Sequence, residues 1–179
     1  MASVVSVSRN EKHGFSKIAV DFIELVADEG VVGDAHRGES VKHRSRVKKD
    51  AAQPNLRQVH LIHVELIQEL KDKGFNVEPA TLGENITTIG LDLLALPRDT
   101  VLRFPGGAEL VITGLRTPCH QLDDYQKGLT AAVLDRDDDG NLIRKAGVMA
   151  IVKTGGRVQG GDSIAVIYPD APHQRLEPV

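Results

Sequence analysis

Cys119 is the residue of this sequence with the clearest potential for chemistry. It lies in the segment 116–120 (Arg-Thr-Pro-Cys-His), directly after the strand-like residues 109–113. A loop that follows a strand exposes its side chains, and a neighbouring arginine and histidine favour the reactive thiolate. The alternative is a small buried side chain, which is what most unpaired cysteines are.

A basic segment and a polar strand start could hold an anion and a heterocycle. Residues 41–49 carry five Lys or Arg side chains, among them Arg44 and Arg46. Guanidinium groups match the oxygens of a phosphate, although a solvated loop explains the same charges. Residues 83–85 (Gly-Glu-Asn) offer donors and acceptors suited to a heterocycle, and a capped strand start is the alternative.

Acidic and histidine side chains supply the atom types of a metal site. Asp34 and His36 form one group, and His60 and His63 follow further along the chain. Their spacing matches no zinc motif, and a strand over residues 57–62 places His60 and His63 on opposite faces. Surface histidines that bind no metal are therefore the favoured interpretation.

An acidic segment over residues 135–140 resembles the start of a calcium-binding loop. Ala146 occupies the position where such a loop needs a bidentate glutamate. An exposed turn or hairpin is therefore predicted in place of a calcium site.

The elements that position these residues are mostly short strands. Gly, Pro and Asp separate runs rich in Val, Ile and Thr, as is typical of strands joined by turns. The predicted strands are 4–7, 22–27, 57–62, 84–89, 101–104, 109–113, 147–152 and 163–168. Apolar residues with helical spacing predict a helix from His63 to Gly74, and further helical stretches are expected over 128–134 and after Pro118. The pattern predicts a mainly β fold, a closed or partly open antiparallel β-barrel with a few peripheral α-helices.

Composition excludes several classes of protein. One cysteine in 179 residues forms no intramolecular disulfide and no Cys₄ or Cys₃His zinc site. A net charge of -3 and six aromatic residues argue against nucleic acid as a partner. No apolar run approaches the roughly 18 residues of a membrane span, and no signal peptide is expected. The sequence therefore predicts one soluble, cytoplasmic domain over residues 1–179, ending in an extended tail over 169–179.

The order of four sequence blocks resembles the MOSC domain family, named after the C-terminal domain of molybdenum cofactor sulfurases. The resemblance spans about residues 14–168. The blocks are 33–38 (Gly-Asp-Ala-His-Arg-Gly), 57–61 (Arg-Gln-Val-His-Leu), 82–88 (Leu-Gly-Glu-Asn-Ile-Thr-Thr) and 117–119 (Thr-Pro-Cys). The segments 146–150 and 155–162 resemble the final strands of the family.

The resemblance implies a β-barrel that binds the molybdenum cofactor, a molybdopterin whose dithiolene sulfurs hold the metal. It also implies that Cys119 coordinates molybdenum or carries sulfur, a role suited to a soft thiolate. Asn85 is the leading candidate for contact with the pterin. The other implied cofactor-binding residues are Gly83, Glu84, Lys17, Asp34, His36, Arg57 and Thr117, with Arg44 and Arg46 as a clamp for the pterin phosphate or a substrate-facing loop. A basic surface insertion is the alternative for the last two.

As a function, the resemblance implies a two-electron reductase of small N-hydroxylated compounds such as hydroxylaminopurines or amidoximes. A sulfur carrier that holds a persulfide on Cys119 is the alternative, and a degenerate barrel that binds only a partner protein is a third reading. No pyridoxal phosphate is expected, because the sulfurase domain is absent from these residues. One cysteine cannot hold an iron–sulfur cluster either. Electrons or sulfur would therefore come from a separate donor protein.

Overall fold

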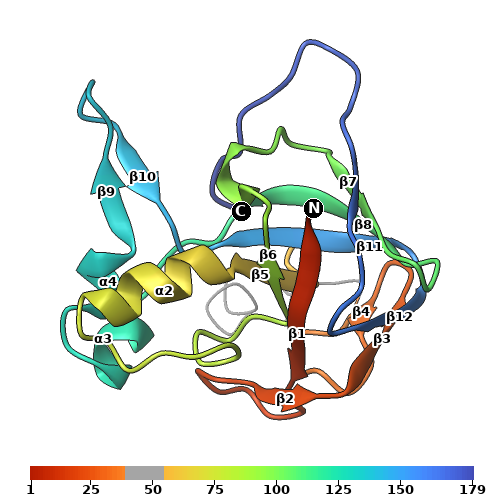
Figure 1. The fold of residues 1–179 in the computed structure, drawn as a ribbon, viewed down its shortest axis with the longest axis horizontal. Helices are drawn as coiled ribbons and strands as arrows, with labels where there is room; N and C mark the ends of the chain where they lie inside the picture. The colour runs from red at the N-terminus through yellow and green to blue at the C-terminus, as the bar shows by residue number, and fades with distance from the viewer. Residues whose placement is uncertain (39–54) are drawn as a thin grey trace.

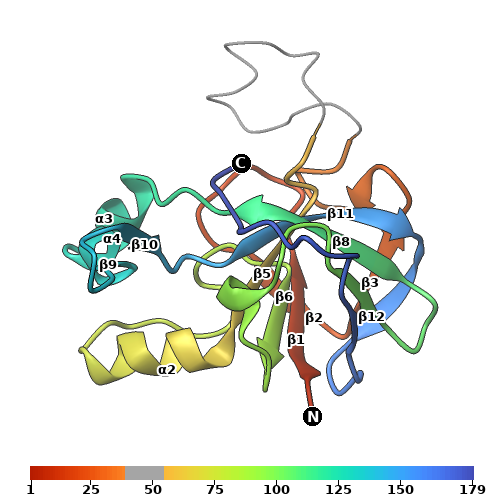
Figure 2. The ribbon, with the colours of Figure 1, turned by 90° about the horizontal axis from the view of Figure 1, so that it is seen from above.

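An eight-stranded sheet forms the body of the protein (Figures 1 and 2). The computed structural model describes residues 1–38 and 55–179, so Arg44 and Arg46 lie outside the described residues. The strands of the sheet run in the order β13-β7-β8-β11-β5-β6-β1-β2. Their bounds are β1 (Ser3–Arg9), β2 (Ile18–Val20), β5 (Val59–His63), β6 (Ile86–Ile89), β7 (Val101–Arg103), β8 (Glu109–Leu115), β11 (Val148–Thr154) and β13 (Ala165–Ile167).

Two smaller sheets and a group of short helices complete the fold. One sheet contains β3 (Phe22–Val26), β4 (Gly30–Val31) and β12 (Gly156–Gln159), and the other contains β9 (Leu134–Arg136) and β10 (Leu142–Arg144). The helices are α2 (Val64–Asp72), α3 (Gln121–Tyr125), α4 (Leu129–Ala132) and the 3₁₀ turn η1 (Leu93–Ala95). Figure 2 shows α2, α3 and α4 gathered at one end of the molecule, to the left in that view.

The predicted elements are largely confirmed, and the fold is mainly β. Each of the eight predicted strands overlaps a strand of the structure, and the three predicted helical stretches contain α2, α3 and α4. The strands that the sequence did not predict are β2, β4, β9, β10 and β12. They span two to four residues each, which is too short to show a periodic pattern.

The predicted antiparallel barrel is not confirmed. β5 and β6 pair in parallel, because α2 and the loop after it return the chain to the same end of the sheet before β6 begins. Among the described residues the strand pairing leaves β13 and β2 as the two edges, so the sheet does not close. The backbone N–H of Val4 does donate to the carbonyl of Asp162 over 2.8 Å. Together with the bond from the N–H of Ile164 to the carbonyl of Ala2 over 3.0 Å, it forms an isolated antiparallel bridge between Ser3 and Ser163, which holds the chain before β13 against β1.

Two apolar clusters hold these elements together. The larger one fills the interior of the sheets and includes Phe104, which is 2% exposed. The second lies beneath the helices, where Leu66, Ile67 and Leu70 of α2 are buried. These three residues recur at helical spacing and so share one face. Each stabilises the fold by about 1.5–3 kcal/mol through burial.

The chain ends in an irregular segment over residues 169–179. Near its end, the carbonyl of Glu177 accepts a hydrogen bond from the N–H of Leu115 over 2.8 Å, and the N–H of Val179 donates to the carbonyl of Leu115 over 3.1 Å. The tail is therefore attached to the end of β8. Within the described ranges, no helix has the length and apolar character needed to cross a membrane.

Candidate functional site

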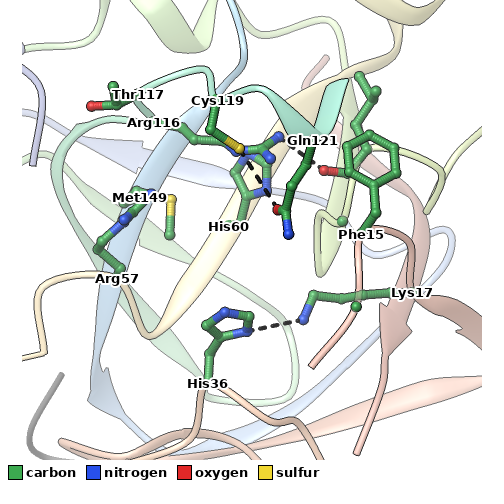
Figure 3. Close-up of a pocket in the computed structure, with 13 residues that line it drawn as sticks. Phe15, Lys17, His36, Arg57, His60, Arg116, Thr117, Cys119, Gln121 and Met149 are labelled. Atoms are coloured by element: carbon green, nitrogen blue, oxygen red, sulfur yellow. Dashed lines mark hydrogen bonds between the residues drawn. The ribbon is translucent and has the colours of Figure 1, made fainter. Parts of the chain in front are cut away.

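A cleft lies where the loops after β1, β4 and β8 meet (Figure 3). These loops lie far apart in the sequence, and the pairing of β5 with β11 and β6 brings them together. The cleft is lined by Gly14, Phe15, Lys17, His36, Arg57, His60, Leu82, Gly83, Arg116, Thr117, Cys119, Gln121 and Met149.

Cys119 is held at the cleft by the backbone on both sides of it. The N–H of Arg116 donates to the carbonyl of Gly147 over 3.0 Å, which fixes the chain as it leaves β8. The carbonyl of Cys119 accepts from the N–H of Leu122 over 3.2 Å, so α3 begins directly after the cysteine. The Sγ atom lies 3.6 Å from Oε1 of Gln121, and Figure 3 shows both side chains on the same side of the cleft. The half-buried thiol thus faces the cleft from a fixed backbone.

Three cations line the cleft. They are Lys17, Arg57 and Arg116, and none of the described lining residues is acidic. The guanidinium group of Arg116 donates to the carbonyl of Leu82 over 2.9 Å, which fixes its orientation. Burial lowers the pKa of Arg116, and the neighbouring Cys119 acts in the opposite direction. The lining of the cleft is therefore electropositive, an environment that attracts anions.

The carboxylate of Asp34 lies behind the cleft and organises its lower wall. Its side chain is 0% exposed, and its Oδ1 lies 2.6 Å from Nζ of Lys17. Oδ2 accepts the backbone N–H of His36 over 3.1 Å, and Oδ1 accepts the amide of Asn85 over 3.3 Å. Burial alone would raise the pKa of Asp34, but the hydrogen bonds from His36 and Lys17 and the charge of Lys17 hold it well below its usual range. Asp34 is therefore an anion that positions Lys17 and His36.

His60 forms the floor of the cleft as a neutral imidazole. It is 6% exposed, and its Nε2 lies 2.8 Å from the carbonyl oxygen of Ala146, so Nε2 carries the proton. Burial lowers the pKa of His60 well below 6.5, and the charges of Arg116 and Arg57 reinforce the shift. The interpretation of His60 as a surface histidine was therefore wrong.

Asn85 and Glu84 lie beneath the cleft and do not line it. The carbonyl oxygen of the Asn85 side chain accepts the N–H of His60 over 3.1 Å, so the amide connects β6 to β5. Glu84 is 0% exposed, and its Oε1 accepts the N–H of Ala80 over 2.6 Å and the hydroxyl of Thr87 over 3.0 Å. Burial raises the pKa of Glu84. Both residues support the strands that carry the cleft.

Six of the predicted site residues line one cleft. They are Cys119, Thr117, Lys17, His36, Arg57 and Gly83. Sequence reasoning missed Phe15, Gln121 and Met149, named Arg116 only as a neighbour of the cysteine, and considered His60 only as a metal ligand. For His60 a signal was present, because it belongs to a nearly continuous apolar strand, which is typical of a strand buried on both faces.

The histidines and acids considered as metal ligands do not converge. In the described ranges no three His, Cys, Asp or Glu side chains form a group able to hold a metal ion. His60 faces the cleft, whereas His63 precedes α2. In the acidic segment, the carboxylate of Asp137 accepts the N–H groups of Asp139 and Asn141 over 3.0 and 2.8 Å. That carboxylate closes the hairpin turn that the sequence predicted there.

Comparison with known proteins places the chain in a wider group. The sequence model of the MOSC domain matches residues 47–165. A Bacillus subtilis (strain 168) protein, YuaD, is 29% identical over 150 residues, which cover 76% of each chain, and its name contains the words "metal-sulfur cluster biosynthesis proteins". The crystal structure of the B. subtilis YUAD protein matches 95% of this chain and 98% of its own, with 25% identity and a TM-score of 0.75. YiiM from Geobacillus stearothermophilus shares the fold at 15% identity, with a TM-score of 0.66 over 98% of this chain and 80% of its own.

Proposed function

This chain belongs to the MOSC domain family, and from that membership we propose that its cleft binds the molybdenum cofactor with Cys119 as the protein ligand of the metal. One observation carries the proposal: a single cleft contains the thiol of Cys119 together with Lys17, Arg57 and Arg116. A soft thiolate suits molybdenum, and the cations suit the negative charge of a phosphorylated pterin.

The residues present fit this group in charge and in donor chemistry, since three cations and one thiol line the same cleft. Lys17 and Arg57 would bind the phosphate, since both line the cleft. Asp34 does not line the cleft, and its part would be to hold the ammonium group of Lys17 in place. His36 and Thr117 would complete the wall beside the cofactor.

For the reaction, we propose a two-electron reduction of small N-hydroxylated compounds. The cofactor would supply the redox chemistry when bound. The chain would contribute the thiolate of Cys119, the orientation of the pterin and a mouth lined by Phe15 and Gln121 for the substrate. Electrons would come from a separate donor protein, because one cysteine cannot hold an iron–sulfur cluster. A cytoplasmic location belongs to the same proposal, since the thiol stays reduced there.

The test is to measure molybdenum and pterin in protein purified from a host that makes the cofactor. We expect about one of each per chain in the wild type, and loss of molybdenum in Cys119→Ser, because a hydroxyl is a poor soft ligand. His120→Ala is the matched control, since His120 adjoins the cysteine but is exposed and does not line the cleft. Wild-type protein without molybdenum, or equal metal content in Cys119→Ser, would refute the proposal.

A sulfur carrier is the second candidate, favoured by the half-buried position of Cys119 and by the name of the relative YuaD. A persulfidated cysteine desulfurase would transfer its terminal sulfur to the Cys119 thiolate and regain its own thiolate. The intact mass of the chain would then rise by about 32 Da, and Cys119→Ser would show no adduct. Molybdenum-dependent turnover of N-hydroxylated substrates without such an adduct would favour the reductase.

A further inference from the structure

The reduction proposed above needs a proton donor inside the cleft. The overall change is N–OH + 2e⁻ + 2H⁺ → N–H + H₂O, so the substrate takes up protons as well as electrons. Hydroxide is a poor leaving group, and a side chain that protonates the oxygen while the N–O bond breaks speeds such a step by about 10²–10⁴-fold. A residue that lines the cleft and releases a proton near neutral pH would fill this role.

Most polar residues that line the cleft keep their protons. Its two guanidinium groups stay charged in proteins. Lys17 holds its ammonium group 2.6 Å from the buried carboxylate of Asp34, so losing that proton would leave a buried anion without its cation. His60 is buried and neutral, and its Nε2 proton is bound to a backbone carbonyl. Cys119 is the metal ligand of the proposed function. Among the described lining residues this leaves His36, because an imidazole changes charge between about pH 5 and 8.

A buried carboxylate holds the ring of His36. Its Nδ1 lies 3.5 Å from Oδ2 of Asp34 and 3.5 Å from Nζ of Lys17, and its backbone N–H donates to the same Oδ2 over 3.1 Å. Hydrogen bonds of catalytic groups are often long before the substrate binds. Nε2 lies across the ring from Nδ1 and so points away from Asp34. Figure 3 shows the ring directed into the cleft from the side opposite Cys119.

His36 can regain a proton from water between turnovers. Its side chain is 28% exposed. The exposed His13 packs edge to face on the ring, with centroids 5.3 Å apart. The titratable and charged groups around His36 in the described ranges are therefore His13, Lys17 and Asp34, with Arg57 lining the same cleft. Burial raises the pKa of Asp34, but the hydrogen bond from the His36 side chain and the ammonium group of Lys17 hold it well below its usual range, so Asp34 accepts as an anion.

We propose that His36 is the proton donor of this reductase and gives the proton on its Nε2 to the substrate oxygen as the N–O bond breaks. This role rests on the function proposed above. The oxygen leaves as water, and the ring stays neutral with its Nδ1 proton directed at Asp34. The two electrons come from the molybdenum cofactor when it is bound, and the second proton, which the nitrogen takes up, comes from the solvent. His36 then takes a proton from the solvent for the next cycle.

Reduction of benzamidoxime by the cofactor-loaded chain, with reduced methyl viologen as electron donor, tests the proposal between about pH 5 and 9. In the wild type we expect kcat to fall towards high pH, where the donor has lost its proton. His36→Gln should keep its molybdenum and pterin, lower kcat about 100-fold or more and lose this fall. His36→Ala should regain rate when imidazole is added, in proportion to the protonated fraction of the imidazole. His173→Gln is the matched control, because His173 is exposed on the tail and does not line the cleft.

¹⁵N NMR of the cofactor-free chain gives a readout that needs no turnover. We expect the neutral ring of His36 to carry its proton on Nδ1, because Asp34 accepts it there. A neutral ring protonated on Nε2, or a metal-loaded His36→Gln with kcat within about threefold of the wild type, would overturn the proposal and leave the reductase function standing. Loss of molybdenum in His36→Gln, without rescue of His36→Ala by imidazole, would assign His36 to holding the cofactor and overturn its role as donor. A molybdenum-loaded wild type that reduces no N-hydroxylated probe would overturn this proposal and the proposed reduction together.

Discussion

Replacing Lys17 by methionine removes the cation that faces the buried carboxylate of Asp34. The side chain of Lys17 is 6% exposed and that of Asp34 is 0% exposed, so water cannot replace the lost charge. Removing one member of a buried ion pair costs about 3–5 kcal/mol. Asp34 keeps hydrogen bonds from the backbone of Asn10 and His36, which places the expected loss at the lower end, about 3 kcal/mol. That is a large share of the roughly 5–15 kcal/mol that stabilises a typical domain.

The assay is urea unfolding of wild type and Lys17→Met at several pH values. In the wild type the folded-state pKa of Asp34 lies well below its ordinary value of 3.8. The ionised carboxylate of Asp34 therefore makes its full contribution to the free energy of unfolding above pH 3.8, and this contribution is lost as the pH falls through the folded-state pKa. In the variant, burial without the cation raises the pKa, so Asp34 takes up a proton on mild acidification. The difference in unfolding free energy between the two proteins should narrow as the pH falls from 7 to about 4.

Lys73→Met is the matched control for this experiment. Lys73 pairs with Glu69 over 2.9 Å, but both side chains are more than a third exposed. Surface pairs of this kind contribute about 0.5 kcal/mol or less. A loss below about 1 kcal/mol in Lys17→Met would refute the reasoning that the Asp34 pair acts as a buried ion pair. A loss that does not change with pH would refute the assignment of the effect to Asp34.

Four further changes follow from the backbone geometry, the cleft and the core. Gly83→Ala should destabilise the protein by about 3 kcal/mol or more in thermal unfolding, because Gly83 has φ +85 and a Cβ there would lie 2.5 Å from the carbonyl oxygen of Phe15. Gly107→Ala, with φ +91 and nothing within 4 Å, should cost only about 1 kcal/mol. In the wild type, the lowered pKa of His60 makes the unfolded chain bind a proton at a higher pH than the folded chain, so the free energy of unfolding falls as the pH drops below 6.5. His60→Gln removes this group, so the free energy of unfolding should depend less on pH in that range. Leu70→Ala should cost about 2–5 kcal/mol in urea unfolding, since Leu70 is 0% exposed beneath α2.

Local patterns predicted the elements of this fold better than their arrangement. The spacing of Leu66, Ile67 and Leu70 predicted α2 because an amphipathic helix must place its apolar residues on one face. The parallel pairing of β5 with β6 left no such mark on the sequence. It depends on where the loop after α2 returns the chain, which is decided by packing between distant segments. Strands as short as β4, with two residues, exist only because a neighbouring strand accepts their hydrogen bonds.

For the candidate site, too, the sequence indicated single residues better than their arrangement. Cys119 was singled out because its type and neighbours already indicate chemistry, but its meeting with Lys17 and Arg57 depends on contacts between loops far apart in sequence. From the sequence alone, only the resemblance to the MOSC domain family connected the segments that carry these residues. The supporting role of Asn85 was hidden, because an amide suited to a heterocycle is equally suited to holding the backbone of His60.

The buried carboxylate behind the cleft also constrains how this protein can change during evolution. Asp34 holds Lys17, the backbone of His36 and the amide of Asn85, and that amide holds the backbone of His60. A neutral residue at position 34 would leave the ammonium group of Lys17 without its anion. We therefore expect positions 17, 34 and 85 to change together among descendants of one ancestor.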